Sequence, residues 1–398
     1  MRGLRLWSRG PRSAAFLRLR RGPRLILALL LPAALCRPAV ALPGRAGEAG
    51  AQFLRLGAGV RSLGMGDAYS AVADGPEAVY WNPAGIAQLR APEFSYARSE
   101  HLGLFHHDFA AYVHPVEAWR GALGLAVTHV SQTRLPLVDK DNVVVGDFSP
   151  YSMAVAAAYA RDFSSGDRAF DEGPFRCKLS GSSLSFDDCD SQDFRYGAEE
   201  RVLLGGFSVK GIVESLHDHK AWAAALDAGV LLRPASAERL SLSLCVRHLG
   251  TQEKFIREKT DLPLEGAAGA SYELGWEKGR FVPALEFTAP AYGEPSGNLG
   301  GEYTTRLGED AGASFRFGYK TLTVKDLGPM SGFTVGLGLR LRRLSVDFGF
   351  QPAAALGQTF RMGASWRFLG IRDPLELRRE PRKKSPWSDR PWERSPWR

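Results

Sequence analysis

Two groups of histidines have side chains that could bind a metal ion. The first lies in HLGLFHHDFAAYVH at residues 101–114, and the second is HDH at residues 217–219. Zinc sites usually combine histidine with cysteine or carboxylate ligands at recognisable spacings. Here no cysteine lies nearby, and the close acids, Asp108 and Asp218, are immediate sequence neighbours of the histidines. We therefore expect polar loop histidines, no metal site and no cofactor.

A glycine-rich stretch at residues 56–89 could instead hold a phosphate group. It lacks the third glycine of the dinucleotide fingerprint, and its glycines are not followed by the Lys-Ser/Thr pair of a phosphate-binding loop. It does contain a helix start, because Asn82 can cap a short helix that has Pro83 at its first position. The chain also has no GxSxG motif and no discernible Ser-His-Asp set. We expect no catalytic residues and no enzyme activity.

The first 41 residues have the pattern of a secretory signal. An arginine-rich region precedes the short apolar run LILALLLPAALC, and AVA at residues 39–41 offers a cleavage site. The whole chain has a net charge of +8, and this segment contributes nine arginines and no acid, so the mature protein is left at −1. A protein of that charge is not expected to bind nucleic acid.

The rest of the chain is dominated by segments in which apolar and polar side chains alternate. In TFRMGASWRF at residues 359–368, Phe360, Met362 and Trp366 share one face, and Arg361 and Arg367 lie on the other. Alternation with period two is typical of a β-strand that has one apolar face. We expect fourteen strands, at residues 93–99, 107–115, 120–130, 151–162, 203–212, 221–232, 239–249, 264–274, 280–289, 297–306, 312–320, 332–341, 343–350 and 357–368.

Two folds fit such strands. In a soluble sandwich the apolar faces pack inward, whereas in an outer-membrane barrel they face lipid. The export signal, the even number of strands and the polar faces rich in Gly and Arg favour the barrel. The predicted fold is therefore all-β, a 14-stranded transmembrane antiparallel barrel at residues 93–368. Its expected location is the outer membrane of a Gram-negative cell, after Sec-dependent export.

The lengths of the connections between predicted strands also alternate. Those after even-numbered strands are short, whereas long ones follow odd-numbered strands, at residues 131–150, 250–263 and 321–331. If the N-terminus is periplasmic, the short turns face the periplasm. The connection at residues 163–202 breaks this pattern, and we expect an inserted, periplasmic-side loop. Cys177 and Cys189 within it could form a disulfide, because an exported chain meets an oxidising compartment.

The compact segment at residues 42–92 could fill the barrel, because fourteen strands enclose a lumen too wide for wall side chains alone. Its sequence QFLRLGAGVRSLGMGDAYSAVADGPEAVYWNPAGIAQL, with the closing strand FRMGASWRF, resembles PorV/PorQ-type outer-membrane proteins, which are related to FadL-type fatty-acid channels. The resemblance covers residues 49–368. It implies an N-terminal hatch whose gating residues, carried over by position, are Gly64, Met65, Gly66, Asn82, Pro83, Ala84 and Gly85.

Charged residues are also expected on the lumen side of the strands. In barrels such groups commonly pair across the lumen and set its electric field, although a binding site is the other interpretation. The chain departs from the family pattern in the 163–202 connection and in a tail at residues 369–398, which is rich in Pro, Trp and Arg and is expected to be disordered. The expected lumen-facing residues are Asp227, Arg247, Arg316, Arg340, Asp347 and Arg361.

The resemblance implies two functions. A PorV/PorQ-type barrel would be a secretion-associated (type IX-like) or assembly component that binds translocon or cargo proteins. A FadL-like barrel would be a passive channel for long-chain fatty acids or other hydrophobic small molecules. A permanently plugged, structural barrel in outer-membrane lipid is the third alternative. The Gly-, Ser- and charge-rich interior faces favour the first function, whereas an apolar pocket between hatch and wall would favour the second.

Overall fold

The computed structural model describes residues 47–101, 103–164, 202–237, 239–255, 257–276, 279–307, 311–353 and 357–368. Several regions singled out in the sequence lie outside these residues. They are the signal at residues 1–41, Cys177 and Cys189, most of the 163–202 connection, and the tail at residues 369–398.

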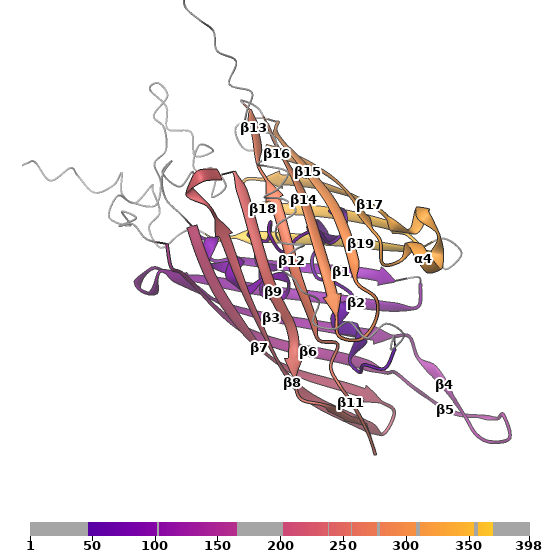
Figure 1. The fold of residues 1–398 in the computed structure, drawn as a ribbon. Coiled ribbons are helices and arrows are strands. Elements are labelled where there is room, and N and C mark those ends of the chain that lie inside the picture. The colour runs from indigo at the N-terminus through magenta and orange to yellow at the C-terminus, as the bar shows by residue number, and fades with distance from the viewer. Residues whose placement is uncertain are drawn as a thin grey trace, which may run out of the picture.

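Fourteen strands of the described chain form one antiparallel barrel (Figure 1). They agree with the predicted strands in number and order, and their ends differ by at most two residues, except that β7 runs four residues further. They are β1 (Glu93–His101), β2 (Phe105–Val116), β3 (Gly121–Gln132), β6 (Tyr151–Asp162), β7 (Val202–Leu216), β8 (His219–Arg233), β9 (Leu240–Gly250), β12 (Glu265–Tyr272), β14 (Gly279–Pro290), β15 (Ser296–Arg306), β16 (Ala311–Lys320), β17 (Phe333–Leu341), β18 (Leu344–Pro352) and β19 (Gln358–Arg367).

The barrel closes where its first and last strands meet. β1 pairs antiparallel with β19, with Ser95 opposite Ser365 in the register. β12 pairs with both β9 and β14, and β13 (Leu274–Trp276) continues its line along β14. Each barrel strand therefore has a hydrogen-bonded neighbour on both sides, and the predicted closed barrel is confirmed.

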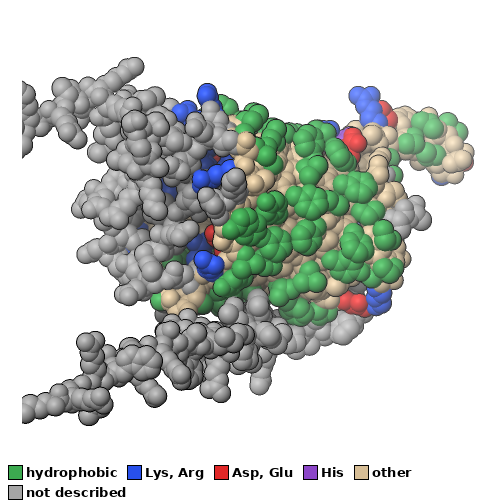
Figure 2. All heavy atoms as spheres, turned by 90° about the horizontal axis from the view of Figure 1, so that it is seen from above, with side chains coloured by type: hydrophobic (Ala, Val, Ile, Leu, Met, Phe, Trp, Pro, Cys, Tyr) green, Lys and Arg blue, Asp and Glu red, His purple; other side chains and the backbone are tan. Residues whose placement is uncertain are grey.

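The alternation of side chains places the apolar face of the strands outside. On β8, Trp222 is 68% exposed and Asp227 is fully buried, and on β19, Phe360 is 39% exposed and Arg361 only 1%. Figure 2 shows hydrophobic side chains over a broad band of the exterior, with charged side chains toward its two ends. Exposed apolar groups around buried charges are the reverse of a soluble core, so this band is a surface for lipid. The chain is a membrane-spanning β-barrel of the outer-membrane type.

Three of the four exposed tryptophans among the described residues lie at one rim of this band. Trp119, Trp276 and Trp366 are each about half exposed. All three lie near the end of the barrel where β1 begins and β19 ends, which we call the terminal end. Tryptophan is enriched where the hydrocarbon meets the lipid headgroups, because its ring is apolar and its N–H is polar. The terminal end therefore has the aromatic rim expected at a membrane interface.

The connections differ between the two ends of the barrel (Figure 1). At the terminal end they are short, as in η3 (Glu117–Trp119), η5 (Ala235–Ala237) and the Arg342–Arg343 turn, except for the connection between β6 and β7. The opposite end, which we call the loop end, holds two hairpins and a helical turn that were not predicted. These are β4 (Leu135–Val138) with β5 (Val144–Phe148), β10 (Glu253–Phe255) with β11 (Glu258–Thr260), and α4 (Val324–Leu327) with η6 (Pro329–Gly332).

The N-terminal segment, residues 47–92, lies inside the barrel. It contains four short helical turns, η1 (Gln52–Arg55), α2 (Val60–Gly64), α3 (Ala78–Trp81) and η2 (Pro83–Gln88). Met65, Ile86 and Trp81 are buried in one cluster with wall residues such as Phe109 and Leu231. Within the described residues, no helix is both long enough and apolar enough to cross a bilayer.

Glycines in the wall let the backbone of this segment come close. Gly318 on β16 faces Gly66, and a Cβ atom added to Gly318 would lie 2.1 Å from the Gly66 nitrogen. Gly206 on β7 faces Pro83, and a Cβ there would lie 2.6 Å from the Pro83 carbonyl carbon. Because backbone atoms cannot yield as a flexible side chain does, these wall positions admit only glycine.

Replacing Gly318 with Val should therefore push the N-terminal segment off the wall. We expect a cost of about 1–3 kcal/mol from overpacking. The measurements are the thermal unfolding midpoint of the detergent-purified protein and the rate of proteolysis within the segment. Gly297→Val on the adjacent strand β15 is the matched control, because nothing lies within 4 Å of a Cβ atom there. Equal behaviour of the two variants would contradict the close approach.

Candidate functional site

Asn82 holds a turn of the N-terminal segment against the wall. Its Oδ1 accepts a hydrogen bond from the Ala84 backbone nitrogen at 3.1 Å, as expected of a helix cap with Pro83 at the first position. Its Nδ2 donates to the Ser70 carbonyl within the segment at 3.0 Å, and to the Val230 carbonyl of β8 at 3.4 Å. One buried side chain thus fixes the Asn82–Gly85 turn and also ties it to the barrel.

The other predicted hatch residues, Gly64, Met65 and Gly66, end helix α2 and contact the opposite wall. Thr334 of β17 donates a hydrogen bond to the Gly64 carbonyl at 3.3 Å. Met65 is fully buried. Gly66 has a positive φ of 63°, which glycine adopts without strain. The two predicted groups therefore sit at separate contacts between segment and wall. Their role in gating stays a proposal.

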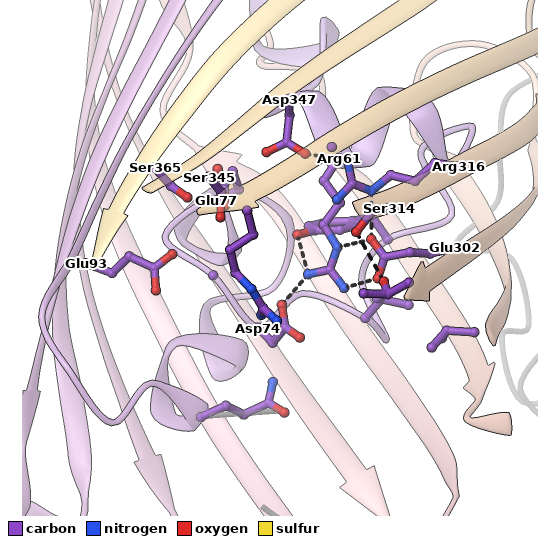
Figure 3. Close-up of a pocket in the computed structure, with 18 of the residues that line it drawn as sticks. Arg61, Asp74, Glu77, Glu93, Glu302, Ser314, Arg316, Ser345, Asp347 and Ser365 are labelled. Carbon is purple, nitrogen blue, oxygen red and sulfur yellow. Dashed lines mark hydrogen bonds and ion pairs between the residues drawn. The ribbon is translucent and has the colours of Figure 1, made fainter. Parts of the chain in front are cut away.

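A chain of alternating charges joins the segment to β15, β16 and β18 (Figure 3). Arg61 donates from Nε and from an Nη atom to the two oxygens of Glu302, both at 2.7 Å. Arg316 donates to Glu302 at 2.7 Å as well. At its two ends the chain continues to Asp74, bonded to Arg61, and to Asp347, bonded to Arg316. The bidentate pairing fixes the orientation of Arg61, because a guanidinium and a carboxylate then share one plane.

A second group of charges lies on the wall facing the other side of the segment. Arg247 of β9 forms an ion pair with Glu265 of β12, with Nε and Oε1 2.7 Å apart, and a longer one with Glu286 of β14 at 3.5 Å. Glu286 in turn accepts hydrogen bonds from the backbone nitrogens of Tyr69 and Ser70, at 2.9 and 2.7 Å. A wall carboxylate therefore satisfies two buried amides that the turn of the segment leaves without a helical partner.

The predicted lumen-facing residues all lie on the inner side of the wall, but they do not form one site. Asp227 pairs with Lys210 of β7 at 2.5 Å. Arg361 donates to the carbonyls of Gly59 and Leu56, at 2.7 and 3.1 Å. Arg340 lines a cavity at the terminal end. Arg247, Arg316 and Asp347 belong to the two charge groups described above.

Arg61 and Glu302 are central to the site and were not singled out in the sequence. Arg61 was present in the quoted segment, within GVRSLGMG, as the lone charge among small and apolar residues. A charge in such a stretch needs a partner if the stretch is buried, and that signal could have found it. Glu302 could not be chosen as the partner, because the sequence does not specify which wall strand faces Arg61.

Two cavities lie on either side of the segment. The terminal-end cavity has a volume of about 350 Å³, opens among β1, β15, β16, β18 and β19, and is lined by many charged side chains, including Glu77 and Glu93. The loop-end cavity has a volume of about 430 Å³ and a mostly apolar lining. The segment itself forms part of its wall, through Phe53 and Leu56, opposite Phe105, Val130 and Leu216 of the barrel.

The histidines are only partly as expected. His217 lies in the turn after β7, a polar loop position, although that turn is tight. His107, in contrast, is an inward-facing residue of β2 and is 2% exposed, so the loop prediction was wrong for it. His106 and His107 are consecutive residues of one strand, so their side chains point to opposite faces. Treating the histidines as one polar group misses this difference. Among the described residues, no group of three or more His, Cys, Asp or Glu side chains is arranged to hold a metal ion.

No protein-family model matches the chain, and no curated protein matches it. Among solved structures, the barrel is similar to the toluene transporter TbuX of Ralstonia pickettii, with 11% identity and a TM-score of 0.45 over 79% of this chain and 99% of that one. It is also similar to the toluene transporter TodX of Pseudomonas putida (8% identity, TM-score 0.46, 78% and 98%) and to a Pseudomonas aeruginosa FadL homologue (9% identity, TM-score 0.43, 78% and 98%). Likeness at this level does not assign a function. The finer resemblance to PorV/PorQ-type proteins stays a prediction.

Glu77 of the N-terminal segment should make docking of the segment depend on pH. Burial, together with the nearby carboxylates of Glu93 and Asp347, raises the pKa of Glu77 from 4.5 to about 7. Between these two pH values the Glu77 carboxyl group is ionised in the unfolded chain and still protonated in the folded one. The free energy of unfolding therefore falls as the pH rises from about 5 to about 7.

The test is the thermal unfolding midpoint of the purified barrel at pH 5, 6, 7 and 8, for the native chain and for Glu77→Gln. The difference between the two proteins should shift in favour of Glu77→Gln as pH rises, and then level off above pH 7. A constant difference across this range would show that Glu77 titrates as it does in water.

Proposed function

We propose that this protein is a passive outer-membrane channel for small hydrophobic molecules, gated by movement of its N-terminal segment. The observation that carries the proposal is the apolar cavity at the loop end, which lies between the segment and the wall. A cavity of about 430 Å³ falls in the size range of small-molecule sites, which are mostly apolar with a few polar groups.

The position of this cavity fits uptake. Its floor is the N-terminal segment, through Gln52, Phe53 and Leu56, and the terminal-end cavity lies beyond that segment. A molecule that enters from the loop end therefore meets the segment first. Passage through the lumen requires the segment to shift, because its buried cluster fills the middle of the barrel.

The contacts that hold the segment are compatible with such a shift. The described contacts are hydrogen bonds, ion pairs and packing, and they lie at separate positions, such as Arg61 with Glu302 and Asn82 with Val230. No described cysteine links segment and wall, since the one described cysteine, Cys245, is free. A gate of this kind opens when a ligand favours the displaced arrangement over the docked one.

A disulfide between segment and wall should close the channel. The Ser70 and Ser243 hydroxyl oxygens are 2.8 Å apart, so cysteines at these positions would have their sulfur atoms within bonding reach. In the oxidised Ser70→Cys/Ser243→Cys protein we expect uptake of a labelled monoaromatic hydrocarbon to fall at least tenfold, in cells whose own hydrophobic channels are deleted. A reductant should restore it.

The single variants Ser70→Cys and Ser243→Cys are the matched controls, and both should transport in either redox state. Equal uptake by the oxidised and reduced double variant would exclude gating by the segment. Uptake no faster than in cells without the protein would exclude the channel itself.

One feature supports a secretion-associated role as the second candidate. The β4–β5 hairpin projects beyond the loop end (Figure 1), and next to its polar tip it exposes Val143, Val144 and Val145 by 56–64%. An exposed apolar stretch of this kind is suited to contact a protein partner. If secretion components co-purify from solubilised outer membranes, replacing the three valines with Ser should release them. Co-purification that is unaffected by the replacement would remove the hairpin as the contact.

A further inference from the structure

One buried and one half-buried histidine have ring nitrogens without partners among the described residues. His107 of β2 is 2% exposed, and neither Nδ1 nor Nε2 makes a hydrogen bond. His101, at the end of β1, has its Nδ1 3.4 Å from the Thr359 hydroxyl and its Nε2 unpartnered. The two ring centroids are 6.0 Å apart. A polar ring atom that is shielded from water and has no partner destabilises the fold, so two such histidines together call for an explanation.

These histidines lie behind the lining of the apolar cavity and are not themselves part of it. His107 lies opposite Val130 in the β2–β3 register and two residues from Phe105 on the same face of β2, and both Val130 and Phe105 line the cavity. The Phe105 ring also stacks on the His101 ring, with centroids 5.1 Å apart and planes inclined by 17°. The pair therefore lies directly behind the part of the lining that Phe105 and Val130 form.

The surroundings of the pair are positively charged. Arg361 lies on the same inner face, and Ser99 is opposite both Arg361 and His107 in the two registers. The Arg361 guanidinium donates to Ser99 Oγ and to the carbonyls of Gly59 and Leu56, which are all neutral acceptors. Its charge is therefore not cancelled by a carboxylate in contact.

The positive charge of Arg361 and the two imidazole rings together determine which ligand groups would be favoured here. Neutral imidazole offers one N–H donor and one acceptor nitrogen. Near an arginine, the approach of a partial negative charge is favoured, and that of a cation is opposed. The pair therefore suits a hydrogen-bond acceptor such as a carbonyl oxygen, and a divalent metal ion would be repelled by Arg361.

We propose that His101 and His107 form a polar subsite directly behind the Phe105 and Val130 lining of the loop-end cavity, and that it selects hydrophobic molecules carrying one acceptor oxygen over hydrocarbons of the same shape. The inference rests on the proposed function, because it concerns the ligand of the same cavity. His107 is the main determinant, since neither of its nitrogens has a hydrogen-bond partner among the described residues. His101 supports it from across the strand pair.

The test compares acetophenone with ethylbenzene, which have the same carbon skeleton and differ by a carbonyl oxygen. Affinities are measured by displacement of a fluorescent hydrophobic probe from the detergent-purified, full-length protein. We expect the native protein to prefer acetophenone, and His107→Phe to weaken acetophenone binding about fivefold to tenfold with ethylbenzene unchanged, as for the loss of one hydrogen bond. His107→Gln, which keeps an N–H donor, should retain part of the preference.

His106→Phe is the matched control, because His106 is the neighbouring residue on the outer face of β2. It should change neither affinity. If both ligands bind with no preference for acetophenone, or if His107→Phe weakens both equally, the polar subsite is excluded while the hydrophobic channel stands. If neither ligand binds the native protein, the proposed function fails, and the subsite fails with it.

Discussion

The hydrogen bonds of the seam between β1 and β19 are the constraint on which the rest of the structure depends. Inside a bilayer no water is available to an open strand edge, and each unpaired backbone group costs several kcal/mol. Closure removes the edge altogether. The fourteen strands of the closed wall enclose a lumen that wall side chains cannot fill. The internal segment occupies the space that the closed wall creates.

The internal segment and the wall are complementary in charge as well as in shape. Glu302 would be a buried carboxylate without enough donors if Arg61 did not reach it, and the amides of Tyr69 and Ser70 would be unpaired without Glu286. Buried charges and amides of this kind destabilise a protein when one partner is removed. Each surface therefore depends on the other. At the loop-end cavity the segment and the wall face each other mostly with apolar side chains and do not pair in this way. The proposed ligand would occupy this gap.

The fold could be predicted from the sequence because it is encoded locally. Alternation along each strand, as in Phe360, Arg361 and Met362, reports which face meets lipid, and the order of strands follows the order of the chain. The hairpins β4–β5 and β10–β11 escaped because they are only three to five residues long and lie in polar connections. The site was harder, because its pairs join residues far apart in sequence. Asn82 could be recognised from its own neighbours, whereas Glu302 becomes significant only once Arg61 is placed against β15. His107 begins a strand that was predicted at residues 107–115, but it was interpreted as a polar loop residue and its inward direction was missed.

The path of the N-terminal segment has a consequence for how the molecule is built. Near its start, the Gly50 nitrogen is bonded to the Asp261 carbonyl at the loop end, and at its finish, the Pro92 carbonyl accepts from the Phe368 nitrogen at the terminal end. The segment is thus threaded along the axis and anchored at both mouths, with bulky Trp81 and Tyr80 between. If the barrel closed first, the N-terminal segment would have to enter lengthwise through one mouth and pass the charged wall residues with which it pairs. Assembly is simpler if the strands form around a segment that is already in place. The pairing of β19 with β1 would then come last, and this one step would both close the barrel and enclose the segment.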